Sequence, residues 1–466
     1  MPPPTLEAST PTGRTAYGEA LPIRAVGVSS RRSNSPTSQR HSMQRVPLLA
    51  QDHTVLFESP DSARVYCYSP GICRLDSGRL VATMDLGGPG MTEWPDPKGI
   101  RYGRPVQGKV FTSDDGGVTW QHRADYPFMH QRPFVAGNSV YILGQCHDPM
   151  VLRSDDDGDT WSEPSALTDG ENWHQAPANV WHDHGCVYAV MEVRVDRGVK
   201  GWAVANIAPV LMRGRLDADL TQRENWTFAS QLVFEDLFEM DEMDCFGVPF
   251  YHTERKRSIS RVPGRDCAPI GWLETHVVRI TDSDHVWHDP SGRTFHLVSR
   301  AHTGGTGYAC LSKVVEQGAV AGTGEMVTQL ETVPSGKRCL YLPMPGGQMK
   351  FHVVYDAEMA LYWLLSTQAT DSMRKLETLP PDRFNLANNE RRRLQLHFSR
   401  NMVDWCFAGM VAIGEVEKAS RHYASLCIDG DDLVVLSRSG DGRAKSPHDG
   451  NLITFHRISG FRGLVY

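Results

Sequence analysis

Several titratable side chains stand at the ends of apolar runs, where a strand gives way to a loop. Glu274 and His276 lie at one such end, Arg300 and His302 at another, and the run Arg421-His422-Tyr423 at a third. Polar groups of this kind are costly to bury without partners, so their convergence on one place indicates a site. The residue types present are those of acid–base chemistry.

Two reactions suit this set of residue types. In glycoside hydrolysis, two carboxylates flank the scissile bond, one as acid and one as base or nucleophile, while arginines hold an acidic sugar. The candidate carboxylates for hydrolysis are Asp85, Glu192 and Glu274, and the candidate arginines are Arg194, Arg300 and Arg421. In β-elimination beside a uronate, arginine neutralises the sugar carboxylate and His or Tyr removes the C5 proton. The candidates for elimination are His174, His302, His422 and Tyr423.

Composition excludes several other classes of protein. The 466 residues include 48 Lys plus Arg against 55 Asp plus Glu, so the net charge is −7 and no basic face for nucleic acid is indicated. No apolar run approaches the roughly 18 residues that span a bilayer, and no secretory signal is visible at the N-terminus. We therefore expect neither nucleic acid nor membrane as a partner, and a cytoplasmic location by default; the sequence does not indicate an oligomeric state.

The sequence predicts neither a metal site nor a cofactor. The ten cysteines are scattered without a CxxC pair, which is typical of buried reduced thiols. His285, His288 and His296 crowd one hairpin, but their positions suit turn and solvent faces.

The elements that must position these residues are strands. Residues 1–45 are rich in Pro, Ser, Thr and Arg and lack periodic apolar positions, so we predict a disordered leader there and a folded domain over 46–466. From about residue 50, short runs of β-branched and aromatic residues alternate with turn residues. Six strand-turn-strand units follow this pattern: 71–82, 134–143, 178–191, 277–298, 351–365 and 426–436. An array of small sheets protects its exposed edge strands when the sheets are arranged in a closed ring. A closing strand is available from either terminus, at 451–456 or 54–57.

Two octets share the pattern Ser-x-Asp-x-Gly-x-Thr-Trp. They span 113–120 and 154–161, with degenerate copies at 399–405 and 224–226. The acidic side chain suits a turn that binds its own backbone, Gly supplies a positive φ, and Trp is a large apolar plug. The octets are therefore expected to be structural turns, and Asp115 and Asp156 are not expected to be catalytic.

These octets resemble the Asp-boxes of the sialidase (neuraminidase) superfamily. The resemblance implies a six-bladed β-propeller of four-stranded antiparallel blades, which matches the count of six hairpins. It also implies that the octets lie between the third and fourth strands of a blade, on the face opposite the active site.

If the octets lie on one face of the propeller, the candidate site residues lie on the loops of the opposite face. The opposite face is built from the loop that leads into each blade and the loop after its second strand. These loops contain Tyr68, Ser69, Asp85, Arg132, His147, His174, Glu192, Arg194, Glu274, His276, Arg300, His302, Lys350, Arg421, His422, Tyr423 and Arg438. From this set we predict as catalytic His174, Glu192, Glu274, His302 and Tyr423. We predict as substrate-binding Asp85, Arg194, His276, Arg300, Arg421 and His422.

One segment departs from the sialidase pattern. Sialidases open their first blade with an Arg-Ile-Pro-type segment whose arginine binds the sugar carboxylate, whereas the matching segment here is 68–72, Tyr-Ser-Pro-Gly-Ile. The missing arginine weakens the case for sialic acid. The sequence thus predicts an exo-acting glycosidase on an acidic or deoxy sugar. A uronate lyase and a non-catalytic glycan-binding propeller remain as alternatives.

Overall fold

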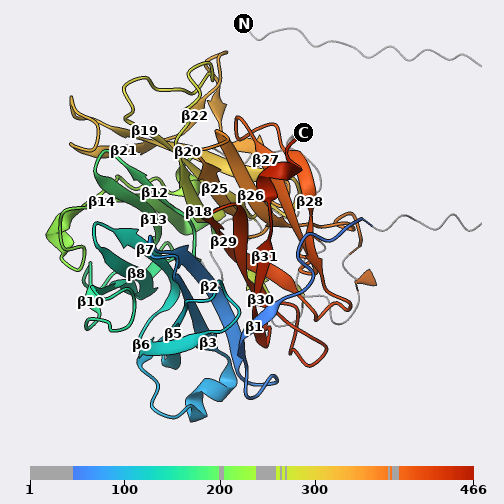
Figure 1. The fold of residues 1–466 in the computed structure, drawn as a ribbon. Helices are drawn as coiled ribbons and strands as arrows, with labels where there is room; N and C mark the ends of the chain where they lie inside the picture. Colours follow the sequence, from blue (N-terminus) through green and yellow to red (C-terminus); the bar gives the residue numbers. More distant parts are fainter. Residues whose placement is uncertain are drawn as a thin grey trace, which may run out of the picture. The chain divides into compact units, whose positions relative to one another are not determined.

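The fold is a ring of six antiparallel sheets, the blades of a β-propeller (Figure 1). The computed structural model describes residues 46–198, 204–237, 259–262, 265–267, 270–375, 378–379 and 388–466. The predicted leader at 1–45 therefore lies outside the described residues. Within them, the regular elements are strands and short 3₁₀ turns, without an α-helix. The six-bladed propeller expected from the octets is confirmed.

Five blades are built from strands that follow one another in the chain, and the sixth is completed by β1; in every blade the first of the neighbouring strands is nearest the axis. Blade 1 contains β2 (Tyr66–Arg74), β3 (Leu80–Gly87), β5 (Arg104–Ser113) and β6 (Gln121–Tyr126), with β4 (Gly99–Arg101) paired to β5. Blade 2 contains β7 (Met129–Ala136), β8 (Ser139–Cys146), β9 (Asp148–Ser154) and β10 (Ser165–Ala166). Blade 3 contains β12 (Val180–Asp183), β13 (Cys186–Arg194), β14 (Ile207–Arg215) and β15 (Trp226–Phe228), with β11 (Trp173–His174) also paired to β13.

The second half of the ring follows the same plan. Blade 4 contains β18 (Trp272–Val278), β19 (Thr294–Ala301), β20 (Tyr308–Glu316) and β21 (Met326–Gln329), with β24 (Tyr341–Pro343) paired to β20. Blade 5 contains β25 (His352–Asp356), β26 (Leu361–Thr367), β27 (Arg393–Ser399) and β28 (Cys406–Ile413). Blade 6 contains β29 (Arg421–Asp429), β30 (Asp432–Ser439), β31 (Leu452–Ile458) and β1 (Thr54–Glu58). Two hairpins, β16 (Ile259–Val262) with β17 (Arg265–Cys267) and β22 (Glu331–Thr332) with β23 (Arg338–Cys339), form separate small sheets.

The six hairpins expected from the sequence are the first two strands of the six blades. Their apolar residues interdigitate between neighbouring blades, as where Val434 and Leu436 of β30 share a core with Leu80 and Ala82 of β3. Such inter-blade burial provides the main stabilisation, because each small sheet exposes two faces that a neighbour must cover.

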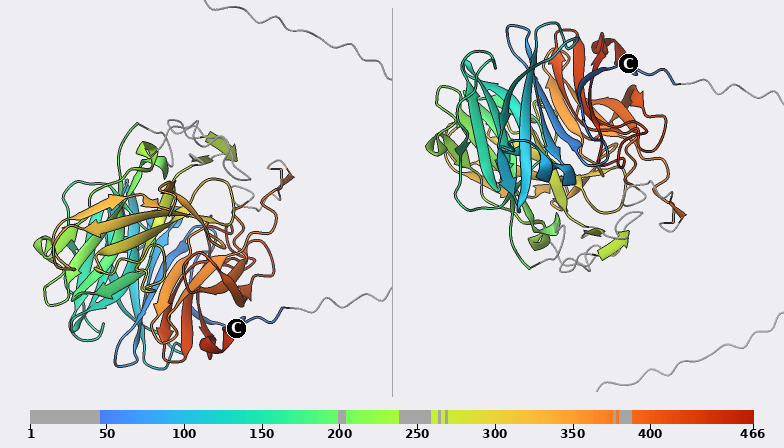
Figure 2. Two further views of the ribbon diagram at one scale, coloured as in Figure 1. Left: turned by 90° about the horizontal axis from the view of Figure 1, so that it is seen from above. Right: turned by 90° about the horizontal axis from the view of Figure 1, so that it is seen from below.

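Both termini close the ring within one blade. Strand β1, from the start of the described chain, pairs antiparallel with β31, so that Thr54 lies opposite Phe455 and Glu58 opposite Leu452. Figure 2 shows this first segment, in dark blue, beside the red C-terminal strands. The sequence offered two alternative closing strands, and the structure uses both.

The two octets form the same hydrogen-bonded turn. In the first, Ser113 Oγ donates to Asp115 at 2.8 Å and accepts from the Gly117 N–H, while Asp115 accepts from the Thr119 N–H at 2.9 Å. Hydrogen bonds from Thr119 and Ser113 lower the pKa of Asp115 to about 2. The second octet repeats these bonds between Ser154, Asp156, Gly158 and Thr160.

The octets follow the third strands of blades 1 and 2, as the resemblance implied. The degenerate copies occupy the same place: Ser399 Oγ accepts from the Met402 N–H between β27 and β28, and Trp226 follows β14. An octet or a degenerate copy therefore follows the third strand in four blades, although the copy in blade 3 begins with a 3₁₀ turn in place of the octet turn.

The octet tryptophans lie at the seam between blades and are half-buried, which corrects the expectation of a deep core plug. Trp120 Nε1 donates to the Gly117 carbonyl oxygen, and the indole packs edge-on against Phe455 of blade 6, with ring centroids 5.5 Å apart. Gly117 has φ of 91°, and a Cβ there would lie 2.2 Å from the Phe455 ring.

We expect Trp120→Ala to lower the free energy of unfolding by about 2 kcal/mol, because it removes part of this inter-blade contact and leaves a partly open cavity. Equilibrium denaturation measures the change. Val118→Ala in the same turn is the control, since Val118 is 68% exposed and its loss should change stability by less than about 0.5 kcal/mol. Equal stabilities of Trp120→Ala and Val118→Ala would contradict the seam role.

Candidate active site

Four of the six innermost strands carry a β-bulge at the same height. At each bulge a non-glycine residue takes a positive φ, a costly conformation in which a bulge re-aims a side chain. These residues are Ser69 (46°), His130 (57°), Glu274 (60°) and Tyr423 (48°). The repeated strain marks one level of the ring.

This level lies at the opposite end of the ring axis from the octets. Strand β5 pairs antiparallel with β3, and β3 with β2, so β2 and β5 run in the same direction. The first octet follows the C-terminal end of β5, whereas Ser69 precedes the long C-terminal half of β2. We call the end that carries the four bulged residues the mouth.

The strongest contacts at the mouth join blades 4 and 6. The Tyr423 hydroxyl donates to Glu274 Oε1 at 2.5 Å, and Arg300 Nη1 donates to the Tyr423 oxygen at 2.8 Å. Arg300 Nη1 also lies 3.3 Å from Glu274 Oε2, while its Nε donates to the Gln348 carbonyl oxygen. Burial and the neighbouring Glu274 carboxylate raise the pKa of the Tyr423 phenol. The carboxylate is thus in position to accept the phenolic proton.

Two further guanidinium groups flank the same phenol. The Cζ of Arg391 lies 5.3 Å from the centre of the Tyr423 ring, and that of Arg438 lies 5.2 Å from it. Arg438 also covers the ring of Tyr68 at 4.1 Å. Together with Arg300, they surround Tyr423 with positive charge from blades 4, 5 and 6.

Asp85 supplies a second carboxyl group to this end of the ring. It lies opposite Tyr68 in the β2–β3 ladder, is completely buried, and accepts a hydrogen bond from the His130 N–H at 3.1 Å. Burial raises the pKa of the Asp85 carboxyl to about 7, although the His130 bond and the Arg438 charge oppose the shift. Asp85 is therefore able to give up a proton near neutral pH.

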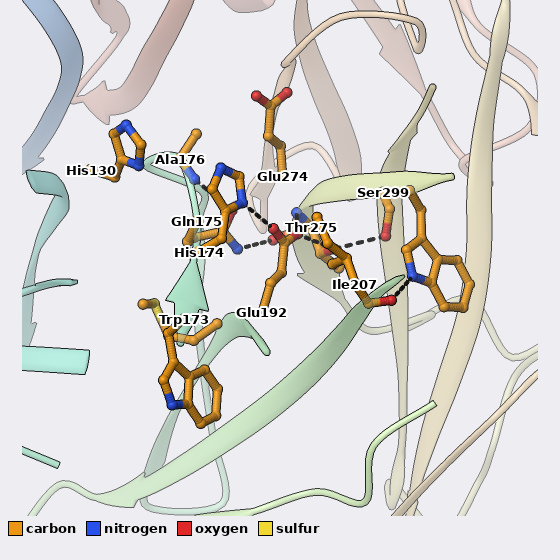
Figure 3. Close-up of polar contacts among 12 residues, drawn as sticks. His130, Trp173, His174, Gln175, Ala176, Glu192, Ile207, Glu274, Thr275 and Ser299 are labelled. Atoms are coloured by element: carbon orange, nitrogen blue, oxygen red, sulfur yellow. Dashed lines mark hydrogen bonds and ion pairs between the residues drawn. The ribbon is translucent and has the colours of Figure 1, made fainter. Parts of the chain in front are cut away.

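Glu192 and His174 form a supporting network below Glu274. Glu192 Oε2 lies 2.8 Å from His174 Nδ1, and Oε1 accepts from both the N–H and the hydroxyl of Thr275. Thr275 Oγ1 also contacts Ser299 Oγ at 2.8 Å. Figure 3 shows Glu274, the residue before Thr275, with its carboxylate turned away from Glu192. Glu192 thus ties blade 3 to the bulge that aims Glu274.

Two predicted histidines lie close to this group of residues. The His422 ring packs edge-on against Tyr423, with centroids 5.2 Å apart, and its Nδ1 contacts Arg391 at 2.8 Å. Burial and the charges of Arg391 and Arg438 hold the pKa of His422 well below its usual range, so the ring is neutral. His302 is buried just after β19, ahead of the Gly-rich loop, and its N–H donates to the Gly271 carbonyl oxygen.

Three other predicted residues are held elsewhere. Arg421 Nη1 donates to the carbonyl oxygens of Ser420 and Gly440, and Arg194 Nη1 donates to the hydroxyl of Tyr102, in the β4–β5 hairpin of blade 1. His276 lies on β18 beyond the bulge, stacked on Phe351 with centroids 4.9 Å apart. His276 Nδ1 lies 3.2 Å from the Glu274 carbonyl oxygen, so this imidazole contacts the backbone of the bulge and not the Glu274 carboxylate. The hydrogen bonds of Arg421 and Arg194 given above go to residues other than Tyr423 and Glu274.

Sequence reasoning missed His130 and Arg391 as site residues. His130 occupies in blade 2 the bulge position that Ser69 occupies in blade 1, whereas the sequence favoured Arg132, two residues further on. Alignment of the six hairpins by strand register would have found it. Arg391 belongs to the basic run 390–393 and carried no strand-end signal.

Over the part of the chain that the structure describes, no group of three or more His, Cys, Asp and Glu side chains is arranged to hold a metal ion. No helix within the same residues is long and apolar enough to cross a membrane.

Comparison with known proteins identifies the fold. No protein-family model and no curated protein matches the chain. Among solved structures, a mutant of the Trypanosoma rangeli sialidase matches 90% of this chain and 60% of its own, with a TM-score of 0.50 and 14% identity. The fold is that of a sialidase-like propeller. A Penicillium chrysogenum α-L-arabinanase matches 89% of this chain and 99% of its own, with a TM-score of 0.46 and 12% identity.

We expect Glu192→Leu to lower the free energy of unfolding by about 3 kcal/mol, because His174 and Thr275 lose a buried charged acceptor. Glu163→Leu, at an exposed position, is the control and should change stability by less than about 0.5 kcal/mol. Thermal and chemical denaturation measure both variants. A Glu192→Leu protein as stable as the control would show that the network does not hold blades 3 and 4 together.

Proposed function

We propose that the protein is an exo-acting glycoside hydrolase that cleaves a terminal acidic sugar. The observation that carries the proposal is the 2.5 Å hydrogen bond from Tyr423 to Glu274, made beside Arg300. A shared fold does not fix function, so the proposal rests on these residues and not on the resemblance of the ring.

In the first step, the Tyr423 oxygen attacks the anomeric carbon while its proton passes to Glu274. Tyrosine is a weak nucleophile when protonated, and an adjacent base activates it. Asp85 donates its proton to the glycosidic oxygen, so that the bond to the leaving group breaks as the bond to Tyr423 forms.

In the second step, the glycosyl group leaves Tyr423. The Asp85 carboxylate removes a proton from water, the water oxygen bonds to the anomeric carbon, and the Tyr423 oxygen recovers its proton from Glu274. Tyr423 thus recovers its own proton, and Asp85 gains a proton from water in place of the one that left with the leaving group. The two displacements together retain the anomeric configuration.

The charge around Tyr423 supports an acidic sugar. Arg300, Arg391 and Arg438 surround the phenol, and guanidinium groups bind carboxylates in a bidentate manner. Arg438 is packed on Tyr68, in the segment where sialidases carry the arginine that this chain lacks. We propose that Arg438, from the neighbouring blade, supplies that positive charge, which keeps sialic acid among the substrates to test.

A uronate lyase is the second candidate, and the neutral His422 ring beside Tyr423 is the observation that favours it. In that reaction an arginine neutralises the uronate carboxylate, and His422 or Tyr423 removes the C5 proton. Glu274 favours hydrolysis over elimination by His422, because removal of the C5 proton by the imidazole leaves no part for a carboxylate bonded to the phenol.

Hydrolysis of a panel of sialosides and uronides, followed by new reducing ends and by the absorbance of an unsaturated uronate, separates the candidates. We expect new reducing ends without the unsaturated product. The unsaturated product would establish the lyase, and binding without turnover would establish a glycan-binding propeller.

We expect Tyr423→Phe to lower kcat by about 10³-fold or more, because the nucleophile is removed while the ring remains. Tyr355→Phe is the matched control, since the Tyr355 hydroxyl contacts Thr281. Near-normal kcat for Tyr423→Phe would refute the nucleophile assignment.

We expect kcat/KM to fall as the pH rises above about 7, because burial raises the pKa of the Asp85 carboxyl to about 7 and the reaction needs its protonated form. Asp85→Asn should lower kcat/KM about 10²- to 10⁴-fold and remove this alkaline limb. The limb is measured from initial rates between pH 5 and pH 9 (about two units on each side of the Asp85 pKa). An unchanged limb in Asp85→Asn would assign it to another group.

A further inference from the structure

A second group of cationic and imidazole side chains lies along the ring axis beyond the mouth. A cavity of about 240 Å³ opens there between the innermost strands, and its lining includes Arg132, Asn179, His352 and Ser425. Exposed Arg74 and His182, which follow the same strands toward the octets, also line it. The cavity thus opens at the octet end, away from Tyr423.

Arg132 is buried in the wall of this cavity without a carboxylate partner among the described residues. Its side chain is 2% exposed, and its two Nη atoms donate to the carbonyl oxygens of Asn179 and Val190. Its Nε makes no hydrogen bond with any described residue. Burial lowers the pKa of Arg132 to about 9, with Glu192 opposing the shift.

Three more side chains with nitrogen donors adjoin Arg132, one lysine and two histidines. Lys350 is 1% exposed and donates through Nζ to the Ala424 carbonyl oxygen and to Ser425 Oγ, which lines the cavity. His352 Nδ1 and His276 Nε2 are buried without hydrogen-bond partners among the described residues, and the two rings lie 5.2 Å apart. Burial, together with the charges of Lys350 and Arg132, holds the pKa of both imidazoles well below their usual range, so the two rings are neutral.

Two carboxylates, Glu192 and Glu274, attract the charges of this group, but both already form hydrogen bonds with other residues. Glu192 acts on Arg132 from a distance but bonds His174 and Thr275, and Glu274 acts on Lys350 but bonds Tyr423. A buried cation is costly unless an anion compensates it. Arg132 therefore carries a buried positive charge, and Lys350, whose pKa burial lowers to about 7, carries part of a second. Both adjoin a cavity several times the volume of one water, whose share of the liquid is about 30 Å³.

We propose that this axial cavity binds a small inorganic anion, a halide or phosphate, between Arg132 and His352. The anion accepts from Arg132 Nε and from His352 Nδ1–H, and it compensates the Lys350 charge behind Ser425. It enters from the octet end, so the site is separate from the proposed reaction at the mouth.

The first test is a crystal grown in sodium bromide, whose anomalous scattering locates bromide directly. We expect a peak between Arg132 and His352. A second crystal grown in sodium phosphate tests the oxyanion. A peak for one anion alone identifies its class, and neither anion in the cavity would overturn the proposal.

The second test measures Tm against bromide and phosphate concentration, with HEPES as the bulky anion at equal ionic strength. A ligand that binds the native state raises Tm with the logarithm of its concentration. We expect this slope in the wild type and in Tyr423→Phe, and its loss in Arg132→Gln, with Arg215→Gln at an exposed position as the matched control. If Arg132→Gln fails to fold, His352→Phe removes the facing nitrogen in its place. Equal slopes in wild type and either folded variant would refute the site.

Discussion

The hydrogen bond between Tyr423 and Glu274 is the interaction on which the proposed chemistry depends. Its two residues are 149 positions apart in the chain and belong to different blades. They meet because the ring places the innermost strands of all blades around one axis, and because a bulge at the same level of β18 and β29 turns each side chain toward that axis. Closure of the ring by β1 and β31 in blade 6 therefore supports the site as well as the fold.

The two ends of the ring differ in how their polar groups are satisfied. At the octet end, Asp115 and Asp156 accept hydrogen bonds from residues of their own turns. These bonds lower the pKa of both carboxyl groups, which therefore stay ionised. At the mouth, Glu274 and Tyr423 adopt strained backbone conformations, and Asp85 is buried with a raised pKa. Backbone strain and raised pKa values are therefore found at the end where groups must exchange protons, whereas hydrogen-bonded turns with lowered carboxyl pKa values are found at the other end.

Much of the architecture was predictable from the sequence, because its signals are local. Turn residues between apolar runs located all six first hairpins, and the octets gave the direction of the axis. Tyr423, Glu274 and Arg300, three of the residues selected at strand ends, prove to contact one another.

The remainder of the site was not predictable, because it depends on register and on side-chain direction. A one-residue bulge decides that His130 faces the mouth and that Arg132 lies deeper in the axis. Arg421 was selected as a clamp and Arg391 was not, yet Arg421 bonds backbone carbonyls while Arg391 flanks Tyr423. The supporting role of Glu192 was not predictable either, since its partner His174 belongs to blade 3 and its partner Thr275 to blade 4.

The most direct test of the central claim is to trap the covalent intermediate. The protein is mixed with an activated fluorinated glycoside of the sugar that it cleaves, digested, and examined by mass spectrometry. The account predicts one glycosyl group, carried by the peptide that contains Tyr423 and bonded to its phenolic oxygen. A glycosyl group on Glu274, or rapid turnover with no adduct on any residue, would contradict it.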